Sequence, residues 1–197
     1  MRLVVCDPAL DSLSGHHRFF DQEICAEAMS RSFDAIIFAH RDYPRQELLD
    51  IPIRRVFSCT CYETTQTNSF TQQFDDFVRY NDAFFEDMIS LGTEIFSKND
   101  LVLFPTVTEN ILFGIAKWIR TIPSDSCPTI VVLLMMPSGI LLNDSSCSQY
   151  TIVDPIKAML YRLALREFAT FKSHVVLLGS SISHAKEQGI SLGSRNL

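Results

Sequence analysis

The sequence predicts an α/β protein with a single Rossmann-like, doubly wound, mostly parallel sheet of about six strands and helices on both faces. Short apolar runs, such as residues 3–6 and 129–134, are typical of strands buried on both faces. Longer segments with apolar residues at helical spacing lie between these runs. Because strands that alternate with helices pair through right-handed crossovers, the expected sheet is parallel. The 197 residues, 47% of them hydrophobic, suffice for one core, so we expect one domain over residues 1–197.

The first half of the chain predicts three strands and two helices. In order, these are a strand over residues 3–6, a helix over 18–31, strands over 33–39 and 51–57, a polar loop over 58–71, and a helix from about 71 to 97. Phe20, Ile24 and Ala28 recur at helical spacing and define the expected buried face of the first helix. Pro52 suits a strand near the sheet edge. The second helix carries an aromatic stripe, which is typical of a core-facing helix, with a cofactor or partner groove as the alternative.

The second half predicts three strands and three helices. In order, these are a strand over residues 101–104, a helix after Glu109, a strand over 129–134, a loop over 137–153, a helix that starts at Asp154 and Pro155, a strand over 174–178, and a short helix over about 182–188. Thr106 and Glu109 have the spacing of a capping box. Aspartate as N-cap followed by proline is a typical helix start. The loop is long enough to have a function.

Composition excludes several classes of partner. The formal charge is −6 and the pI about 5.3, so we expect no nucleic-acid partner and at most peripheral membrane association. The longest apolar run, residues 130–136, is far shorter than the roughly 18 to 20 residues of a membrane span. Asp7 and Pro8 interrupt the N-terminal apolar segment, unlike a signal peptide.

Cys59 and Cys61 lack the spacing of a zinc or thioredoxin motif, so we expect no metal site and six reduced thiols in a cytoplasmic protein.

A candidate site follows from the expected topology, because loops that leave the carboxyl ends of parallel strands collect at one edge of the sheet. The residues at that edge carry glycines, hydroxyls, imidazoles and a guanidinium. They are Gly15, His16, His17, His40, Arg41, Thr106, Glu109, Pro137, Ser138, Gly139 and Ser180. Such a crevice suits a polyhydroxylated or phosphorylated ligand.

These residues differ in the roles that the sequence favours. His16 is the candidate catalytic residue and the others are candidate substrate-binding residues. Of His16 and His17, we expect one in the site as a base or hydrogen-bonding group and the other on the surface or in packing. Glu109 and Ser180 have helix capping as their competing interpretation, because no nucleophile-elbow motif surrounds the serine. The chain has no dinucleotide fingerprint, P-loop or zinc-protease motif, so we expect no cofactor.

The order of these elements resembles the N-terminal half of GT-B glycosyltransferases of the group 1 family. The segments that carry the likeness are residues 14–20 (SGHHRFF), the helix with Ile24, Ala26, Ala28 and Met29, the strand over 33–40, and residues 101–105, 130–137 and 174–189. The resemblance implies an acceptor-binding Rossmann-like domain, with most of the nucleotide-sugar site on a second domain. It also implies that Gly15 and His16 line the interdomain cleft near the donor phosphates. Thr106, Glu109 and Pro137 would then shape the acceptor pocket.

Departures from the family leave competing hypotheses open. Met135, Met136 and Pro137 stand where many relatives have a His or His-Asp pair. A second domain does not follow, so we expect either a truncated product or a chain that needs a partner subunit. The first hypothesis is the acceptor-binding half of an enzyme that transfers a sugar from a nucleotide-sugar to a sugar or lipid acceptor. The second is a non-catalytic α/β interaction module, and the third is a stand-alone small-molecule enzyme, which the missing phosphate and nucleophile motifs disfavour.

Overall fold

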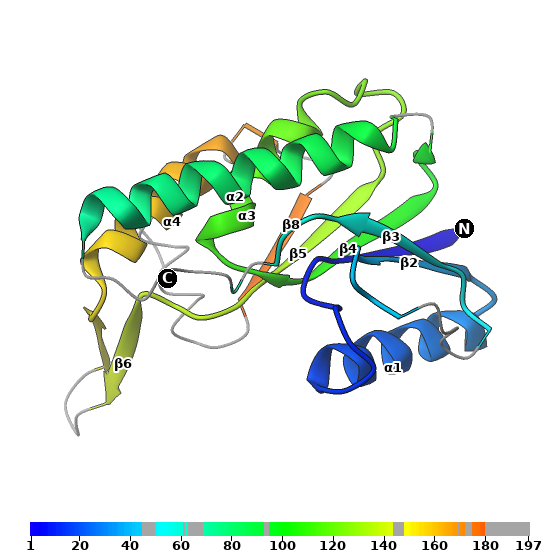
Figure 1. Ribbon diagram of the computed structural model, residues 1–197, viewed down its shortest axis with the longest axis horizontal. Helices are drawn as coiled ribbons and strands as arrows, with labels where there is room; N and C mark the ends of the chain where they lie inside the picture. The colour runs from blue at the N-terminus through cyan, green and yellow to red at the C-terminus, as the bar shows by residue number, and fades with distance from the viewer. Residues whose placement is uncertain are drawn as a thin grey trace.

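The fold is α/β, built on a six-stranded parallel sheet (Figure 1). A computed structural model describes residues 1–44, 50–60, 62, 69–92, 95–143, 148–168, 170–171 and 175–179, with the backbone alone for residues 140–143 and 148–150. The strands of the sheet are β1 (Arg2–Asp7), β2 (Asp34–His40), β3 (Ile53–Phe57), β4 (Asp100–Val107), β5 (Thr129–Leu134) and β8 (Val175–Gly179). Their spatial order is β3-β2-β1-β4-β5-β8, and every neighbouring pair is parallel. This confirms the predicted class, with the arginine-bearing strand β3 at an edge and β5 in the interior.

Helices cover both faces of the sheet, as predicted. Among the described helices, α1 (His16–Ser30) lies on one face, and α2 (Phe70–Ser90), α3 (Glu109–Ile119) and α4 (Pro155–Phe168) form a layer on the other (Figure 1). Right-handed crossovers explain this division. The chain moves from β1 to β2 in one direction along the sheet, and from β3 through β4 and β5 to β8 in the opposite direction.

The alternation of side chains along each strand builds two cores. Val4 and Cys6 point into the larger one, between the sheet and the three-helix layer, where Phe104 and Trp118 are also buried. Leu3, Val5, Cys25 and Ile37 belong to the smaller one, beneath α1. Successive side chains of a strand point to opposite faces, so one short run of the sequence supplies both cores.

Helices α2 and α3 approach closely where a glycine meets a buried amide. Gly114 of α3 donates its N–H to Oδ1 of Asn81 at 2.7 Å, and Nδ2 of Asn81 donates to the carbonyl oxygens of Phe77 at 2.7 Å and Glu109 at 3.0 Å. A Cβ atom at position 114 would lie 2.5 Å from the carbonyl oxygen of Asn81, so only glycine permits this crossing. The contact fixes α3 against α2 and thereby fixes the loop between β4 and α3.

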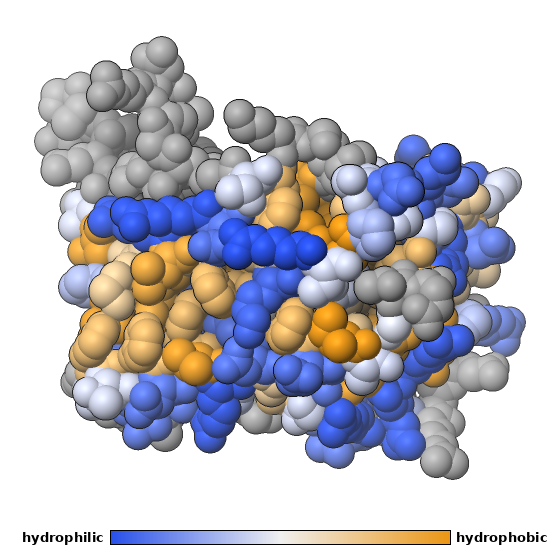
Figure 2. Space-filling view, turned by 90° about the horizontal axis from the view of Figure 1, so that it is seen from above, coloured by the Kyte–Doolittle hydropathy of each residue, from blue (hydrophilic) through white to orange (hydrophobic). Residues whose placement is uncertain are grey.

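The aromatic stripe of α2 is wider than the surface that α3 and the sheet cover. Phe77, Phe84 and Met88 are buried as predicted, whereas Phe74 and Val78 are 37% and 41% exposed. Phe70, Phe74 and Phe77 stack in series on this part of the helix. Figure 2, which looks onto the helix layer, shows hydrophobic side chains gathered between rows of hydrophilic ones on this face.

Four expectations about element boundaries are wrong. Strand β4 runs through Pro105 to Val107, and its register with β5 shifts between Phe104 and Val107, an irregularity that tolerates a proline. The predicted capping box does not form, because Thr108 is the N-cap of α3 and its side chain accepts the N–H of Asn110. Helix α2 ends at Ser90, before the predicted end near residue 97.

The fourth difference concerns the predicted loop over residues 137–153. It contains an antiparallel hairpin of β6 (Gly139–Asn143) and β7 (Ser148–Ile152). The start of α4 is confirmed, because Oδ1 of Asp154 accepts the N–H of Lys157 at 2.9 Å. The predicted helix over 182–188 lies outside the described residues.

Candidate functional site

The strand order reverses between β1 and β4, and this is the point where ligands bind in open parallel sheets. The chain leaves β1 toward α1 on one face and leaves β4 toward α3 on the opposite face (Figure 1). His17, in the first turn of α1, and Thr106, near the end of β4, meet at this point.

His17 and Asp7 form a buried pair at this edge. Asp7 ends β1 and is 0% exposed, and its Oδ2 lies 2.8 Å from Nδ1 of His17, whose side chain is 11% exposed. Oδ1 of Asp7 accepts the N–H of Ala9 at 2.9 Å, which stabilises the carboxylate and fixes its plane. Since a carboxylate only accepts hydrogen bonds, Nδ1 of His17 carries the proton.

Two further groups hold the His17 ring. Oγ1 of Thr106, at the end of β4, lies 3.3 Å from Nδ1, and the ring of Tyr62 packs edge-on at a centroid distance of 5.6 Å. The exposed ring of His16 lies against His17 at 4.1 Å. Nε2 of His17 is buried and has no hydrogen-bond partner among the described residues. With the proton on Nδ1, Nε2 has a free lone pair, which can accept a proton or a hydrogen bond from a ligand hydroxyl.

A second buried carboxyl, Asp21, lies beside Asp7. It is 0% exposed in the second turn of α1. Burial, reinforced by the charge of Asp7 and by a hydrogen bond to that side chain, raises the pKa of Asp21 from 3.8 to about 9. Burial, followed by the charge of Asp21, raises the pKa of the Cys25 thiol to about 12. The acid at position 21 is therefore neutral at physiological pH.

Gly15 supplies the backbone conformation that starts α1. Its φ of 101° and ψ of 172° belong to a region that only glycine adopts readily, and a Cβ atom there would meet nothing within 4 Å. No side chain caps the helix at this position. His16, the first residue of α1, is exposed. The start of this helix thus presents backbone N–H groups at the carboxyl edge.

His40 and Arg41 lie at the end of β2, where their polar atoms are largely engaged. His40 is buried, its Nδ1 accepts the N–H of Asp42 at 3.2 Å, and its Nε2 has no partner among the described residues. The backbone N–H of His40 donates to the carbonyl of Leu10 at 3.1 Å, which connects the end of β2 to the loop after β1. No hydrogen bond, ion pair or ring contact joins His40 or Arg41 to His17 within the described part of the chain.

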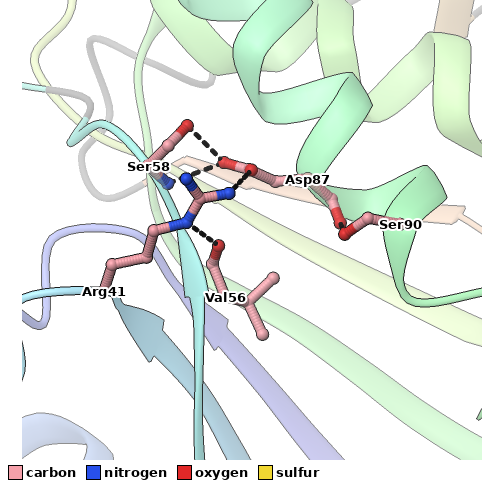
Figure 3. Close-up of polar contacts among 5 residues, drawn as sticks. All are labelled: Arg41, Val56, Ser58, Asp87 and Ser90. Atoms are coloured by element: carbon pink, nitrogen blue, oxygen red, sulfur yellow. Dashed lines mark hydrogen bonds and ion pairs between the residues drawn. The ribbon is translucent and has the colours of Figure 1, made fainter.

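Arg41 belongs to a clamp between two strand ends and α2 (Figure 3). Its Nη2 donates to Oδ1 of the buried Asp87 at 2.8 Å, and its Nε donates to the carbonyl of Val56 at 3.1 Å. Both the N–H and the hydroxyl of Ser58 donate to Oδ2 of Asp87 at 2.7 Å. The clamp holds the carboxyl ends of β2 and β3 against α2, which is a structural role.

The predicted residues after β5 contribute to the hairpin. The carbonyl of the buried Ser138 accepts the N–H groups of Val153 at 2.9 Å and Asp154 at 2.8 Å, which closes the β6–β7 hairpin onto α4. Pro137 is half-buried and Gly139 begins β6. Glu109 begins α3, with Oε2 lying 3.7 Å from Nζ of Lys157. Ser180 lies outside the described residues.

Sequence reasoning missed three residues of this site, namely Asp7, Asp21 and Tyr62. A signal existed for the two acids. Asp7 directly follows a strand of buried residues, and Asp21 lies four residues before Cys25, on the face of α1 that the sheet covers. Tyr62 lies in a polar segment, and no feature of the sequence marked it as a residue of the site.

Other classes of site have no support within the described residues. No three His, Cys, Asp or Glu side chains there gather in a way that could hold a metal ion. No helix in the described ranges is long and apolar enough to cross a membrane.

Comparison with known proteins adds no assignment: no protein-family model, no curated protein and no solved structure significantly matches this chain.

Proposed function

We propose that this chain is a ligand-binding domain of glycosyltransferase type. In this proposal it is the acceptor-binding half of an enzyme that transfers a sugar from a nucleotide-sugar to a sugar or lipid acceptor. Activity would require a further domain or a partner subunit. The observation that carries the proposal is the pairing of His17 with Asp7 at the point where the strand order reverses.

His17 is the residue to which we assign the reactive role. A hydroxyl of the acceptor would donate its hydrogen bond to Nε2, and the positive charge that develops on the ring would be stabilised by Asp7 through Nδ1. The geometry favours His17 over His16 for this role, because His16 is exposed and no carboxylate orients its ring among the described contacts. The open start of α1 at Gly15 is suited to donor phosphates.

The chemistry of the surface and the thiols agrees with this proposal. The buried Cys6, Cys25 and Cys127 are unbridged, which suits a reducing compartment. The net charge of −6 disfavours a nucleic-acid ligand. We therefore place the proposed activity in the cytoplasm.

Calorimetric titration tests the proposal directly. The purified chain would be titrated with uridine and guanosine diphosphate sugars and, separately, with monosaccharide acceptors. We expect binding of at least one ligand, a loss of tenfold or more in affinity for His17→Gln, and unchanged affinity for the matched control His16→Gln. Binding of no ligand would count against a glycosyltransferase role, and loss in His16→Gln alone would transfer the role to His16.

One observation favours the second candidate, a non-catalytic interaction module. An apolar groove of about 400 Å³ lies on the face of the sheet that carries α1, and residues of both the helix and the strands line it. Its sheet floor includes Leu101, Leu103, Val131, Leu133 and Leu178. Exposed apolar surface of this kind is typical of an interface. If the titrations detect no ligand while light scattering detects a stable oligomer that Leu133→Asp dissociates, the interaction module becomes the better interpretation.

A further inference from the structure

Two carboxyl groups are buried side by side beneath the start of α1. Asp7 and Asp21 are both 0% exposed, and after burial the charge of Asp7 and a hydrogen bond to its side chain are the causes that raise the pKa of Asp21. Asp7 receives two N–H donors, from Ala9 and His17. Neither oxygen of Asp21 has a donor from any other residue that the structure describes.

This arrangement requires a proton between the two acids. Two carboxylates can only accept hydrogen bonds, so contact between two ionised, fully buried groups would be repulsive and would leave both oxygens of Asp21 unsatisfied. One proton removes both penalties. It resides on Asp21, because the donors on Asp7 stabilise the ionised form of that residue, and Asp21 has no such donors.

The other groups around Asp21 do not supply a counter-charge. Cys6 of β1 and Cys25 of α1 are buried thiols, and Tyr43, after β2, has a buried hydroxyl with no partner among the described residues. The charge of Asp21 influences the titration of all three. Arg18 is the nearby cation, but its Nη1 donates to the carbonyl of Leu13 at 2.7 Å, and the ion pairs of the described chain include none between Arg18 and Asp21.

We propose that Asp21 is a positioning residue: as a neutral acid it donates its proton to Asp7, so that Asp7 stays ionised and holds His17 with Nδ1 protonated and Nε2 bare. Without this donor, Asp7 would keep only the N–H groups of Ala9 and His17, and the balance between the arrangement with the proton on Nδ1 and the arrangement in which Asp7 donates to Nδ1 would shift toward the second. In the second arrangement the proton of His17 lies on Nε2, and the ring cannot accept a ligand hydroxyl there. The importance of this for catalysis depends on the proposed function, but the position of the proton does not.

The first test follows the ionisation of Asp21 in the ligand-free chain. In ¹³C-labelled protein, the carboxyl resonance that disappears in Asp21→Asn belongs to Asp21. We expect that resonance at its protonated position at pH 7, with a change only near or above pH 8. Titration in the ordinary range of aspartate, about pH 4, would overturn the proposal.

Stability gives an independent test with a definite sign. Asp21 is ionised in the unfolded chain above about pH 4 but neutral in the folded chain up to about pH 9. The folded state therefore binds one more proton in this window, and its stability falls as the pH rises through it. Asp21→Asn removes this loss and keeps a donor for Asp7, so its melting temperature should exceed that of the wild type by an amount that grows from pH 5 to pH 8. A variant that becomes relatively less stable as the pH rises would show that Asp21 is ionised.

The positioning role is read from the tautomer of His17, which ¹⁵N chemical shifts of the ring report. The wild type and Asp21→Asn should both show the Nδ1–H tautomer at pH 7, with His17→Gln identifying the signals. Asp21→Leu, which is similar in size but lacks a donor, should shift the population toward the Nε2–H tautomer. Identical tautomers in the folded Asn and Leu variants would overturn the positioning role. Failure of the ligand titrations alone would leave this result unaffected.

Discussion

Thr106 and His17 meet across the point where the strand order reverses, with 3.3 Å between Oγ1 and Nδ1, although 89 positions separate them in the chain. The contact joins the first turn of α1 to the end of β4. Asp7 lies on the other side of the same nitrogen at 2.8 Å. One imidazole N–H is therefore shared by a strong carboxylate acceptor and a weaker hydroxyl acceptor.

Replacing Thr106 by valine tests how much the weaker acceptor contributes. The side chain keeps its shape but leaves Nδ1 with Asp7 alone, so we expect a loss of about 0.5 to 1.5 kcal/mol in the free energy of unfolding. Urea denaturation would measure it. Thr129→Val, at an exposed position where β5 begins, is the matched control and should change stability by about 0.5 kcal/mol or less. Equal effects of the two substitutions would show that the contact between Thr106 and His17 does not contribute to the free energy of unfolding.

The clamp around Asp87 predicts an asymmetry between its two charged partners. Arg41 is 58% exposed, so Arg41→Met removes a solvent-screened ion pair and should cost about 1 kcal/mol or less. Asp87→Leu leaves the N–H of Ser58 without its acceptor in a partly buried position, and should cost about 2 kcal/mol or more.

Denaturation at low and high salt separates the two contributions to the clamp. The effect of Arg41→Met should shrink as the salt concentration rises, whereas most of the effect of Asp87→Leu should remain. A larger loss for Arg41→Met than for Asp87→Leu would mean that the ion pair, and not the bonds from Ser58, holds β3 against α2.

Much of the fold was predictable because its signals are local. Residues 3–6 and 130–134 are apolar without interruption, and a parallel strand covered on both faces requires that pattern. The β6–β7 hairpin was not predictable in this way, because its segment contains Gly139, Asn143, Asp144 and four serines, which are residue types typical of loops.

The candidate site was predictable only in part, because tertiary contacts select among residues that look equivalent in the sequence. The edge position of His16 and His17 follows from topology, but the position of Asp7 distinguishes them. Thr106 matched a capping box, and the continuation of β4 through Pro105 moved the N-cap to Thr108. An aspartate among the apolar residues of a helix, such as Asp21, has no partner that spacing alone can identify.

The buried thiols should be protected from alkylation in the folded protein. Burial raises the pKa of Cys6, Cys25 and Cys127, with the charges of Asp7 and Asp21 adding to the effect at Cys6. The thiolate is the reactive form, so at pH 8 these three cysteines should react with iodoacetamide only through unfolding. Peptide mass spectrometry would compare labelling in native buffer and in 6 M guanidinium, roughly the concentration that unfolds even very stable domains. Equal labelling of Cys25 in both conditions would contradict its burial beneath α1.

Gly114 should be among the positions of α3 that tolerate substitution least. Alanine normally stabilises a helix by about 1 kcal/mol relative to glycine. Here its Cβ would lie 2.5 Å from the backbone carbonyl of Asn81 and 3.1 Å from Cδ1 of Phe84, so α2 and α3 would have to separate. We expect Gly114→Ala to lower the free energy of unfolding by about 1 to 3 kcal/mol.

Asn81→Leu tests the polar half of the same contact and Glu86→Ala is the control. The leucine leaves the N–H of Gly114 without the side-chain oxygen that accepts it at 2.7 Å, and it adds apolar bulk where the helices are closest, so a loss of about 2 kcal/mol or more is expected. Glu86 is exposed on α2, and its replacement by alanine should change stability by about 0.5 kcal/mol or less. Chemical denaturation of the three variants would measure these differences. If Gly114→Ala were as stable as Glu86→Ala, the close crossing of α2 and α3 would not exist in solution, and the end of β4 that carries Thr106 would not be fixed by this contact.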